Sequence, residues 1–372
     1  MHSAQVSRTS SPRFLVLRRR REPQAAVMLR LVQLTVFHLK SFVWIHLVAA
    51  VYFLWEVALR AKGWFIPNAQ LTYFPVKNAT AVITGGSKGL GFETTQSLLA
   101  LGFRVIVGSS SPKRAAMAKQ RLLEKHPNGQ VEFLLLDLRC MSSVKSFAEE
   151  VIARSATVDL LICNAGVMMV PYSQTEDGFE SHLSVNYLGH CLLTALLLPR
   201  LASAGTARKT ARIVNVTSCV HKAASISFDD LHSKRWYSPY HGYAQSKLAQ
   251  VMFTESLARH LRTGGLPVSV NCVHPGIVDT DLYQMVSWSP LVSGLFFRTP
   301  TEGAETTLYA ALSPAMEGVS GCYLEDCALA NPSCEARDRA SQDRLWEMTW
   351  ACLRPWLAEA TSSLFTGPSQ PS

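Results

Sequence analysis

The sequence predicts an α/β fold: a single domain built on one doubly wound parallel sheet of about seven strands, preceded by an N-terminal membrane segment. Short apolar runs alternate with helical stretches from residue 79 onward, which is typical of a parallel sheet with crossover helices. A glycine-rich turn follows the first run, and an apolar segment occupies residues 31–59. The expected segments are a basic extension (1–28), a membrane anchor (29–60), a linker (61–78), the domain (79–350) and a C-terminal tail (351–372).

The alternation from residue 79 gives the elements in chain order. Seven runs are predicted strands: 79–84, 104–107, 131–136, 158–163, 211–216, 268–273 and 321–324. Five longer stretches are predicted helices: 89–101, 112–125, 142–154, 186–201 and 240–261.

Composition sets limits on the function. The 372 residues are 48% hydrophobic and 17% charged, which suits one large domain with an appendage. The net charge is +9, but residues 18–21 are a single run of four arginines. The positive balance therefore describes the N-terminus, and we expect no nucleic-acid partner. The nine cysteines lack the spacing of a disulfide framework or a metal site.

The apolar N-terminal segment is the predicted anchor. Residues 41–55 carry no charge, and the nine residues before Lys40 extend the segment to the roughly 20 residues that span a bilayer, with Lys40 snorkelling. Trp44, Trp55 and Trp64 suit an interfacial belt. A cleaved signal peptide is disfavoured because no small-residue cleavage site follows.

The arginine run, with Arg30, outweighs Arg60 and Lys62 and predicts a cytosolic N-terminus by the positive-inside rule. A hairpin would keep the domain cytosolic and a single span would not, so the topology stays open. A start at Met28 would delete the arginine run.

The stretch AVITGGSKGLG, residues 81–91, is a strand that enters a glycine-rich turn and then a helix. Gly85 allows the tight turn, Gly89 lets the backbone approach a pyrophosphate, and Gly91 lets the helix pack on the strand. The free N–H groups of the helix N-terminus would then meet the anion. This predicts a Rossmann-type dinucleotide site, with an ordinary glycine-rich turn as the alternative. Further contacts are expected from Ser87, Lys88 and Leu90.

The second strand ends in GSSS, residues 108–111, without the acid that binds a ribose 2′-hydroxyl in NAD sites. This permits NADP without excluding NAD, and Lys88, Lys113 or Arg114 could meet a 2′-phosphate. Asp137, after the third strand, could accept a hydrogen bond from the adenine amino group or could cap the next helix.

Together these motifs resemble the short-chain dehydrogenase/reductase family. The matching residues run in family order from 79 to about 325: Thr84-Gly85-x-x-x-Gly89-x-Gly91, Asn164-Ala165-Gly166, Asn186, Ser218, Tyr243-x-x-x-Lys247 and Pro275-Gly276. The resemblance implies an NAD- or NADP-dependent alcohol dehydrogenase or reductase. It implies cofactor contacts from Ser109, Leu138, Asn164, Ala165, Gly166, Tyr243, Lys247, Val278 and Thr280.

Tyr243 and Lys247 are four residues apart and would share one face of a helix. A nearby cation lowers the pKa of a phenol, so Tyr243 is the expected proton donor and acceptor. By resemblance, Lys247 also binds the nicotinamide ribose, Ser218 orients the substrate oxygen, and Asn186 holds a water that relays protons to Lys247. Each residue alone also has a plain structural explanation.

The substrate side is apolar. Met168, Met169 and Val170 follow the Asn-Ala-Gly turn, and residues 283–297 carry no charge. By resemblance this second stretch forms a mobile substrate lid; core packing or a homodimer contact is the alternative. We therefore expect a lipophilic alcohol or aldehyde.

Within the family, the Ser218–Tyr243 separation of 25 residues and the stretches NAGVMMVP, NYLGH, YAQSKLA and TDLY imply members that act on polyprenol, polyprenal and dolichal at the endoplasmic reticulum or lipid droplets. A retinol or steroid dehydrogenase and a non-catalytic cofactor-binding scaffold are the alternatives.

Overall fold

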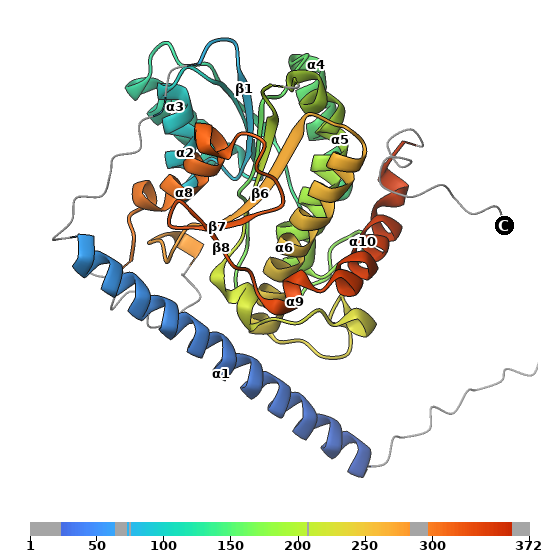
Figure 1. Ribbon diagram of the computed structural model, residues 1–372. Helices are drawn as coiled ribbons and strands as arrows, with labels where there is room; N and C mark the ends of the chain where they lie inside the picture. Colours follow the sequence, from blue (N-terminus) through green and yellow to red (C-terminus); the bar gives the residue numbers. More distant parts are fainter. Residues whose placement is uncertain (1–23, 64–72, 74–75, 207, 283–296, 359–372) are drawn as a thin grey trace, which may run out of the picture.

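The structure is a computed structural model that describes residues 24–63, 73, 76–206, 208–282 and 297–358. A central sheet is covered by helices on both faces, and the long helix α1 (Gln24–Gly63) lies across one end of this assembly (Figure 1).

The sheet has the strand order β3-β2-β1-β4-β5-β6-β7-β8. All neighbours from β3 to β7 pair in parallel, and β8 pairs antiparallel with β7. The strands are β1 (Thr80–Thr84), β2 (Arg104–Ser109), β3 (Val131–Leu135), β4 (Leu160–Cys163), β5 (Ala211–Val216), β6 (Val268–His274), β7 (Tyr323–Glu325) and β8 (Ala328–Ala330).

This order confirms the predicted fold class, a doubly wound parallel sheet, and β1 to β7 correspond to the seven predicted strands. The eighth strand is a three-residue addition at the sheet edge, too short to produce a periodic signal in the sequence.

Helices cover the two faces separately, as Figure 1 shows: α2, α3 and α8 on one, and α4, α5, α6 and α10 on the other. Their bounds are α2 (Gly89–Ala100), α3 (Pro112–Lys125), α4 (Met141–Arg154), α5 (Gly189–Ala204), α6 (Pro239–Thr263), α8 (Pro300–Leu312), α9 (Cys334–Arg337) and α10 (Arg339–Leu353).

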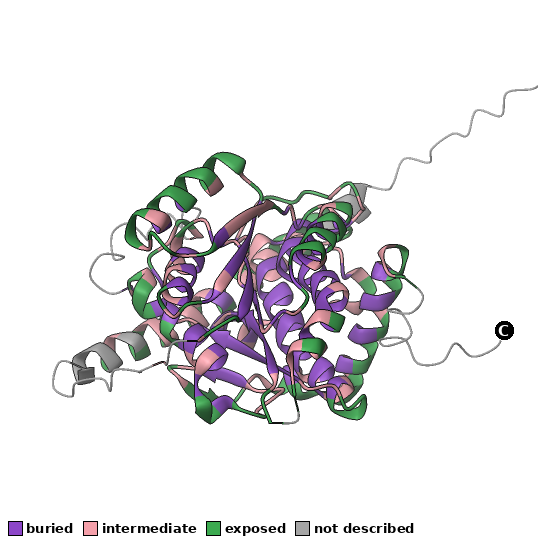
Figure 2. Cartoon of the chain, turned by 90° about the horizontal axis from the view of Figure 1, so that it is seen from above, coloured by how far each residue is buried: buried purple, intermediate pink, exposed green. Residues whose placement is uncertain are grey.

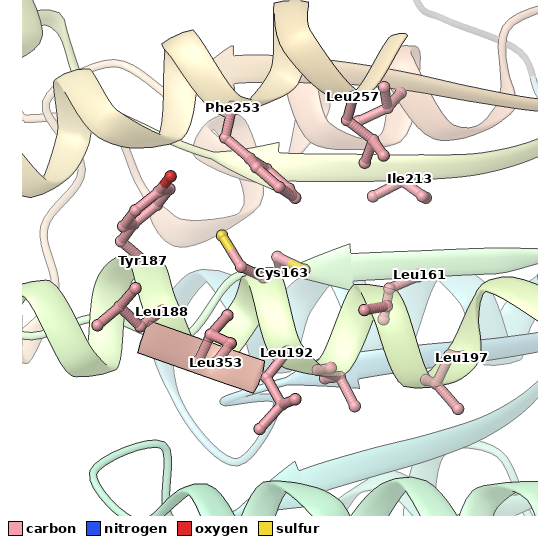
Figure 3. Close-up of a cluster of buried hydrophobic side chains, with 14 of the residues drawn as sticks. Leu161, Cys163, Tyr187, Leu188, Leu192, Leu197, Ile213, Phe253, Leu257 and Leu353 are labelled. Atoms are coloured by element: carbon pink, nitrogen blue, oxygen red, sulfur yellow. The ribbon is translucent and has the colours of Figure 1, made fainter. Parts of the chain in front are cut away.

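Each face of the sheet has its own hydrophobic core. Figure 2 shows the buried residues concentrated in the sheet and in the helices that cover it. In the larger core, α5 and α6 pack on the central strands through residues such as Leu192, Phe253 and Ile213 (Figure 3). Because the central strands are covered on both faces, every residue of β1, β4, β5 and β6 is buried.

The chain order of the strands reverses between β1 and β4. The crossover helices leave the sheet on opposite sides at this point, which opens a crevice at the carboxyl ends of the strands. The fold therefore places the ends of β1, β2, β4, β5 and β6 around one site.

Two predicted segment boundaries fall inside helices of the structure. Helix α1 is continuous over the predicted anchor and enters the predicted linker as far as Gly63. The predicted tail begins inside α10, which continues to the buried Leu353 because that side chain packs in the core. Residues 1–23 and 359–372 lie outside the described residues.

Within the described residues, two helices are long and apolar enough to cross a membrane by length and composition. The segment Leu183–Ala204 is mostly buried and forms part of the domain core, whereas Leu31–Trp55 of α1 is 6% buried. Of these two segments, Leu31–Trp55 is the one whose apolar surface is available to lipid.

Candidate active site

One cavity of about 550 Å³ opens at the carboxyl ends of the strands, within the range of roughly 300–1,000 Å³ common for ligand sites. Three of the four predicted catalytic residues line it: Ser218, Tyr243 and Lys247. Every predicted cofactor contact also lines it: Gly85, Ser87, Lys88, Gly89, Leu90, Gly91, Ser109, Asp137, Leu138, Asn164, Ala165, Gly166, Tyr243, Lys247, Val278 and Thr280.

The glycine turn forms the floor of the phosphate end. Gly85 and Gly89 have φ values of +69° and +52°, which favour glycine. A Cβ at Gly91 would lie 2.4 Å from the Gly85 carbonyl oxygen and 2.5 Å from Asn164 Nδ2. Helix α2 begins at Gly89 without a side-chain cap or an acid in its first turn. The turn therefore fits a pyrophosphate, since the first N–H groups of a helix have no intrahelical partner and favour an anion.

The part of the cavity where the adenosine was predicted, here called the adenosine end, combines acidic and basic groups. Asp137 accepts hydrogen bonds from the Arg139 guanidinium at 2.7 and 3.1 Å, which lowers the pKa of this carboxyl. It does not cap α4, whose N-cap is Cys140. Arg114, on α3, also lines the cavity beside the strand end at Ser109.

Lys88 forms an exposed ion pair with Asp281 at 2.8 Å. Its amine is therefore partly neutralised beside the glycine turn. Among the predicted partners of a 2′-phosphate, Lys88 and Arg114 line the cavity.

The Asn-Ala-Gly segment after β4 is fastened to the glycine turn by Thr84. The Thr84 hydroxyl accepts hydrogen bonds from the backbone N–H groups of Asn164 at 3.0 Å and Ala165 at 2.9 Å. Its Oγ1 also lies 2.8 Å from Nε2 of His190, whose pKa burial lowers to about 4. The neutral imidazole thus joins the end of β1 to α5.

Tyr243 lies in the second turn of α6 and is 3% exposed. Burial raises the pKa of its phenol, and a hydrogen bond with Ser218 opposes that rise. The expected lowering of this pKa by Lys247 does not prevail: the Lys247 amine lies 5.9 Å from the centroid of the phenol ring. The physical reason is desolvation, which penalises the ionised phenol.

Lys247 is buried at the cavity wall, with 4% of the residue exposed. It donates hydrogen bonds to the Val216 carbonyl oxygen at 2.9 Å and to Gln250 Oε1 at 3.0 Å. Burial lowers the pKa of Lys247 to about 7. The side chain can therefore gain or lose a proton near neutral pH, which is a property of proton-handling lysines.

Asn186 stands behind the cavity instead of lining it. It lies in a single π-helical turn, Leu183–Leu188, just before α5, a local irregularity common at functional sites. Its amide exchanges hydrogen bonds with the Val167 backbone at 2.8 and 3.0 Å and donates one to Ser246 at 2.9 Å. Gly166 separates it from Lys247, since a Cβ there would lie 3.2 Å from Asn186 Oδ1 and 3.7 Å from Lys247 Nζ.

The segment after β6, where the nicotinamide contacts were predicted, forms another side of the cavity. In this segment, Val278 forms an isolated parallel β-bridge with Arg298. His274, 4% exposed, lines the cavity with neither ring nitrogen hydrogen-bonded within the described residues. Its pKa is well below the usual histidine value because of burial, so it is a neutral imidazole. The predicted apolar lid lies mostly outside the described residues.

Some residues that line the cavity or pack behind it were not singled out from the sequence. Arg139 gave no signal, because only the fold brings it to the adenosine end. Ile45 of α1 packs in the same cluster as Tyr243 and Met168, and no sequence pattern could join residues so far apart in the chain.

Comparison with known proteins places this geometry in context. The family model described as short chain dehydrogenase matches residues 79–289. Polyprenol dehydrogenase from Homo sapiens is 41% identical over 75% of this chain and 86% of its own length. Retinol dehydrogenase 12 from Homo sapiens is 39% identical over 80% of this chain and 93% of its own length.

Solved structures share the fold. An uncharacterized protein from Mycobacterium paratuberculosis is 33% identical with a TM-score of 0.63, covering 76% of this chain and 96% of that protein. RhlG with NADP from Pseudomonas aeruginosa is 24% identical with a TM-score of 0.56, covering 68% and 97%. The second likeness concerns the fold alone.

Proposed function

The chain belongs to the short-chain dehydrogenase family, and from that premise we propose that it interconverts polyprenols, or related polyisoprenoid alcohols, with their aldehydes. Family membership makes the protein an NAD- or NADP-dependent oxidoreductase. The observation that carries the proposal is the buried Tyr243, hydrogen-bonded to Ser218 and facing the same cavity as the glycine turn.

The proposed chemistry divides between the protein and the dinucleotide. The nicotinamide, when bound, would accept or supply a hydride. Burial keeps the Tyr243 phenol protonated, so it is ready to donate a proton to a carbonyl oxygen during aldehyde reduction. Ser218, the N-cap of the short helix after β5, would hold that oxygen.

Lys247 would help to return a proton to Tyr243 after the phenol has donated its own. Because its pKa is near neutrality, a protonated amine can stabilise the phenolate that reduction leaves on Tyr243. Asn186, fixed by the Val167 backbone and Ser246, would position the water through which Lys247 exchanges protons with solvent.

The choice of substrate class rests on the surroundings of Tyr243. Met168, Val170 and Leu282 line the cavity on this side, and Met168 packs against Tyr243 in an apolar cluster. Such a surface suits a flexible apolar chain better than a charged or sugar-like substrate. The name of the 41% identical relative, polyprenol dehydrogenase, agrees with this choice. The proposed location is the membrane of the endoplasmic reticulum or of lipid droplets.

The test is a substrate comparison with the purified full chain in phosphatidylcholine vesicles. Polyprenal, dolichal and retinal are each supplied with NADH or NADPH, and their alcohols with NAD or NADP. We expect kcat/KM for polyprenal to exceed that for retinal at least tenfold.

Faster turnover of retinal would instead support a retinol dehydrogenase, the second candidate, which the 39% identity to retinol dehydrogenase 12 favours. Binding of the dinucleotide without turnover of any alcohol or aldehyde would support a regulatory scaffold.

A further inference from the structure

Helix α1 has two different faces. Its outer face carries exposed apolar side chains at helical spacing, including Val32, Val36, Leu39, Val43, Leu47, Val51 and Leu54, each at least half exposed. Its inner face carries Ile45, the one fully buried side chain among the described residues of this helix. A continuous apolar stripe facing away from the protein needs an apolar environment.

The inner face packs beside the catalytic tyrosine. Ile45 belongs to a cluster with Met168, Cys219, Val220 and Tyr243. Tyr243 and Met168 also line the cavity. Helix α1 therefore backs the side chains that form the substrate end.

The part of α1 that packs on the domain runs from Phe37 to Tyr52. In its first half, aromatic contacts fix α1 to the start of α6. The ring of Phe37 lies 5.2 Å from that of His241, edge to face, and Phe42 lies 5.2 Å from Tyr240. His46 lies 5.5 Å from Tyr240. These partners are in the turn of α6 immediately before Tyr243.

In the second half of this packed part of α1, a polar cluster around Tyr52 holds the helix to the domain. Tyr52 donates a hydrogen bond to Glu325 at 3.3 Å, and Lys222 donates one to the Tyr52 hydroxyl. Lys222 and Glu325 form an ion pair at 3.6 Å, and each is about a quarter exposed. The Tyr52 ring also lies edge-on to His274, 5.6 Å between centroids. This cluster joins α1 to the end of β7 and to the short helix after Ser218.

The packed length decides how the helix can meet a membrane. From Phe37 to Tyr52 the axis runs roughly 22 Å, most of the roughly 30 Å of a hydrocarbon core. A spanning helix would carry the polar catalytic domain into the bilayer along this length, which the cost of burying charge opposes. Figure 1 shows α1 lying across the end of the domain.

We propose that α1 lies in the plane of a phospholipid bilayer and is at the same time a wall of the substrate chamber: its outer stripe is immersed in lipid, and Ile45 and Tyr52 shape the passage by which a lipid substrate reaches Tyr243. The substrate-class part rests on the proposed function. The membrane arrangement does not.

The first experiment measures depth. A small environment-sensitive fluorophore is encoded at Val36 or, in a second protein, at Val51, and the full chain is bound to phosphatidylcholine vesicles with bromine at a shallow or a deep acyl position. Equal, shallow quenching at both positions is expected for an in-plane helix. Depths that differ by most of the bilayer would show a spanning helix, and no quenching at either would show no insertion; both results overturn the proposal.

The second experiment tests the wall. Ile45→Ala and Tyr52→Phe are assayed with a long polyprenal and with a two-isoprene prenal. We expect KM for the long substrate to change at least fivefold, with the dinucleotide Kd unchanged and the short substrate affected less. Met117→Ala, at an exposed site on α3, is the control.

If both variants affected the two substrates equally, or affected neither, α1 would not be a wall of the substrate chamber. If the wild type turned over neither substrate, the proposed function would fail, and the depth measurement would still decide the membrane arrangement.

Discussion

At the predicted phosphate end of the cavity, Gly85, Gly89 and Gly91 lie close together in the chain, from the turn after β1 to the first turn of α2. At the substrate end, Ile45, Met168 and Tyr243 meet from three distant parts of the chain. The first end is built by backbone conformation, and the second by packing between separate elements. Substitutions at the first end should therefore act on cofactor binding and folding together, whereas those at the second should act on chemistry and substrate choice.

Tyr243→Phe gives the largest expected effect. It removes the hydroxyl that would transfer the proton, and general acid–base catalysis contributes roughly 10²–10⁴-fold. We expect turnover of any accepted aldehyde to fall at least that far, with the dinucleotide Kd within twofold of wild type by fluorescence titration. Tyr240→Phe, one turn earlier on α6, is the matched control. Near-normal turnover by the Tyr243→Phe variant would remove Tyr243 from the mechanism.

Gly91→Ala probes the other end. Its methyl group would overlap the Gly85 carbonyl and Asn164, so dinucleotide binding should be lost and unfolding should become easier by about 1–3 kcal/mol. Titration calorimetry and denaturant unfolding measure the two effects. Gly318→Ala, with φ +73° and no neighbour within 4 Å, should cost about 1 kcal/mol from backbone strain alone. Normal cofactor affinity in the Gly91→Ala variant would contradict the role of the glycine turn in binding the dinucleotide.

Lys247→Met separates charge burial from catalysis. Because the pKa of Lys247 falls from 10.5 to about 7 on folding, the unfolded chain binds more protons between these pH values. The wild type therefore becomes more stable as pH rises from 7 toward 10.5. Relative to the variant, we expect it to gain roughly 2–3 kcal/mol of unfolding free energy between about pH 6 and pH 9. A constant difference between the two proteins across this pH range would show that the amine is not desolvated.

Arg114→Ala gives the smallest expected effect. Arg114 lines the adenosine end of the cavity and the adjacent Lys113 does not. If Arg114 meets a 2′-phosphate, its loss should weaken NADP binding about tenfold, since a charge-assisted hydrogen bond is worth roughly 1.5–3 kcal/mol. NAD binding and the Lys113→Ala control should change less than twofold. Equal losses for both dinucleotides would assign the 2′-phosphate contact elsewhere.

The contrast between the two ends of the cavity also explains which features of the fold and the site could be predicted from the sequence. The fold class follows from the alternation of strands and helices, and the glycine turn from three residues whose backbone roles are local. The spacing of Tyr243 and Lys247 puts them one helical turn apart in any α-helix. The pKa of Tyr243 was predicted in the wrong direction, since its burial depends on α1, β5 and the segment after β4, which the spacing does not describe.

The sequence by itself determined the fold class and the position of the glycine turn, and it predicted that Tyr243 and Lys247 share one face of a helix, because each depends on periodicity or on backbone freedom within a few residues. Tertiary structure alone decided that Arg139 lines the same cavity as the glycine turn, that Asn186 is enclosed behind Gly166, and that α1 lies against α6. These arrangements depend on contacts between elements far apart in the chain, and such contacts leave no local pattern to read.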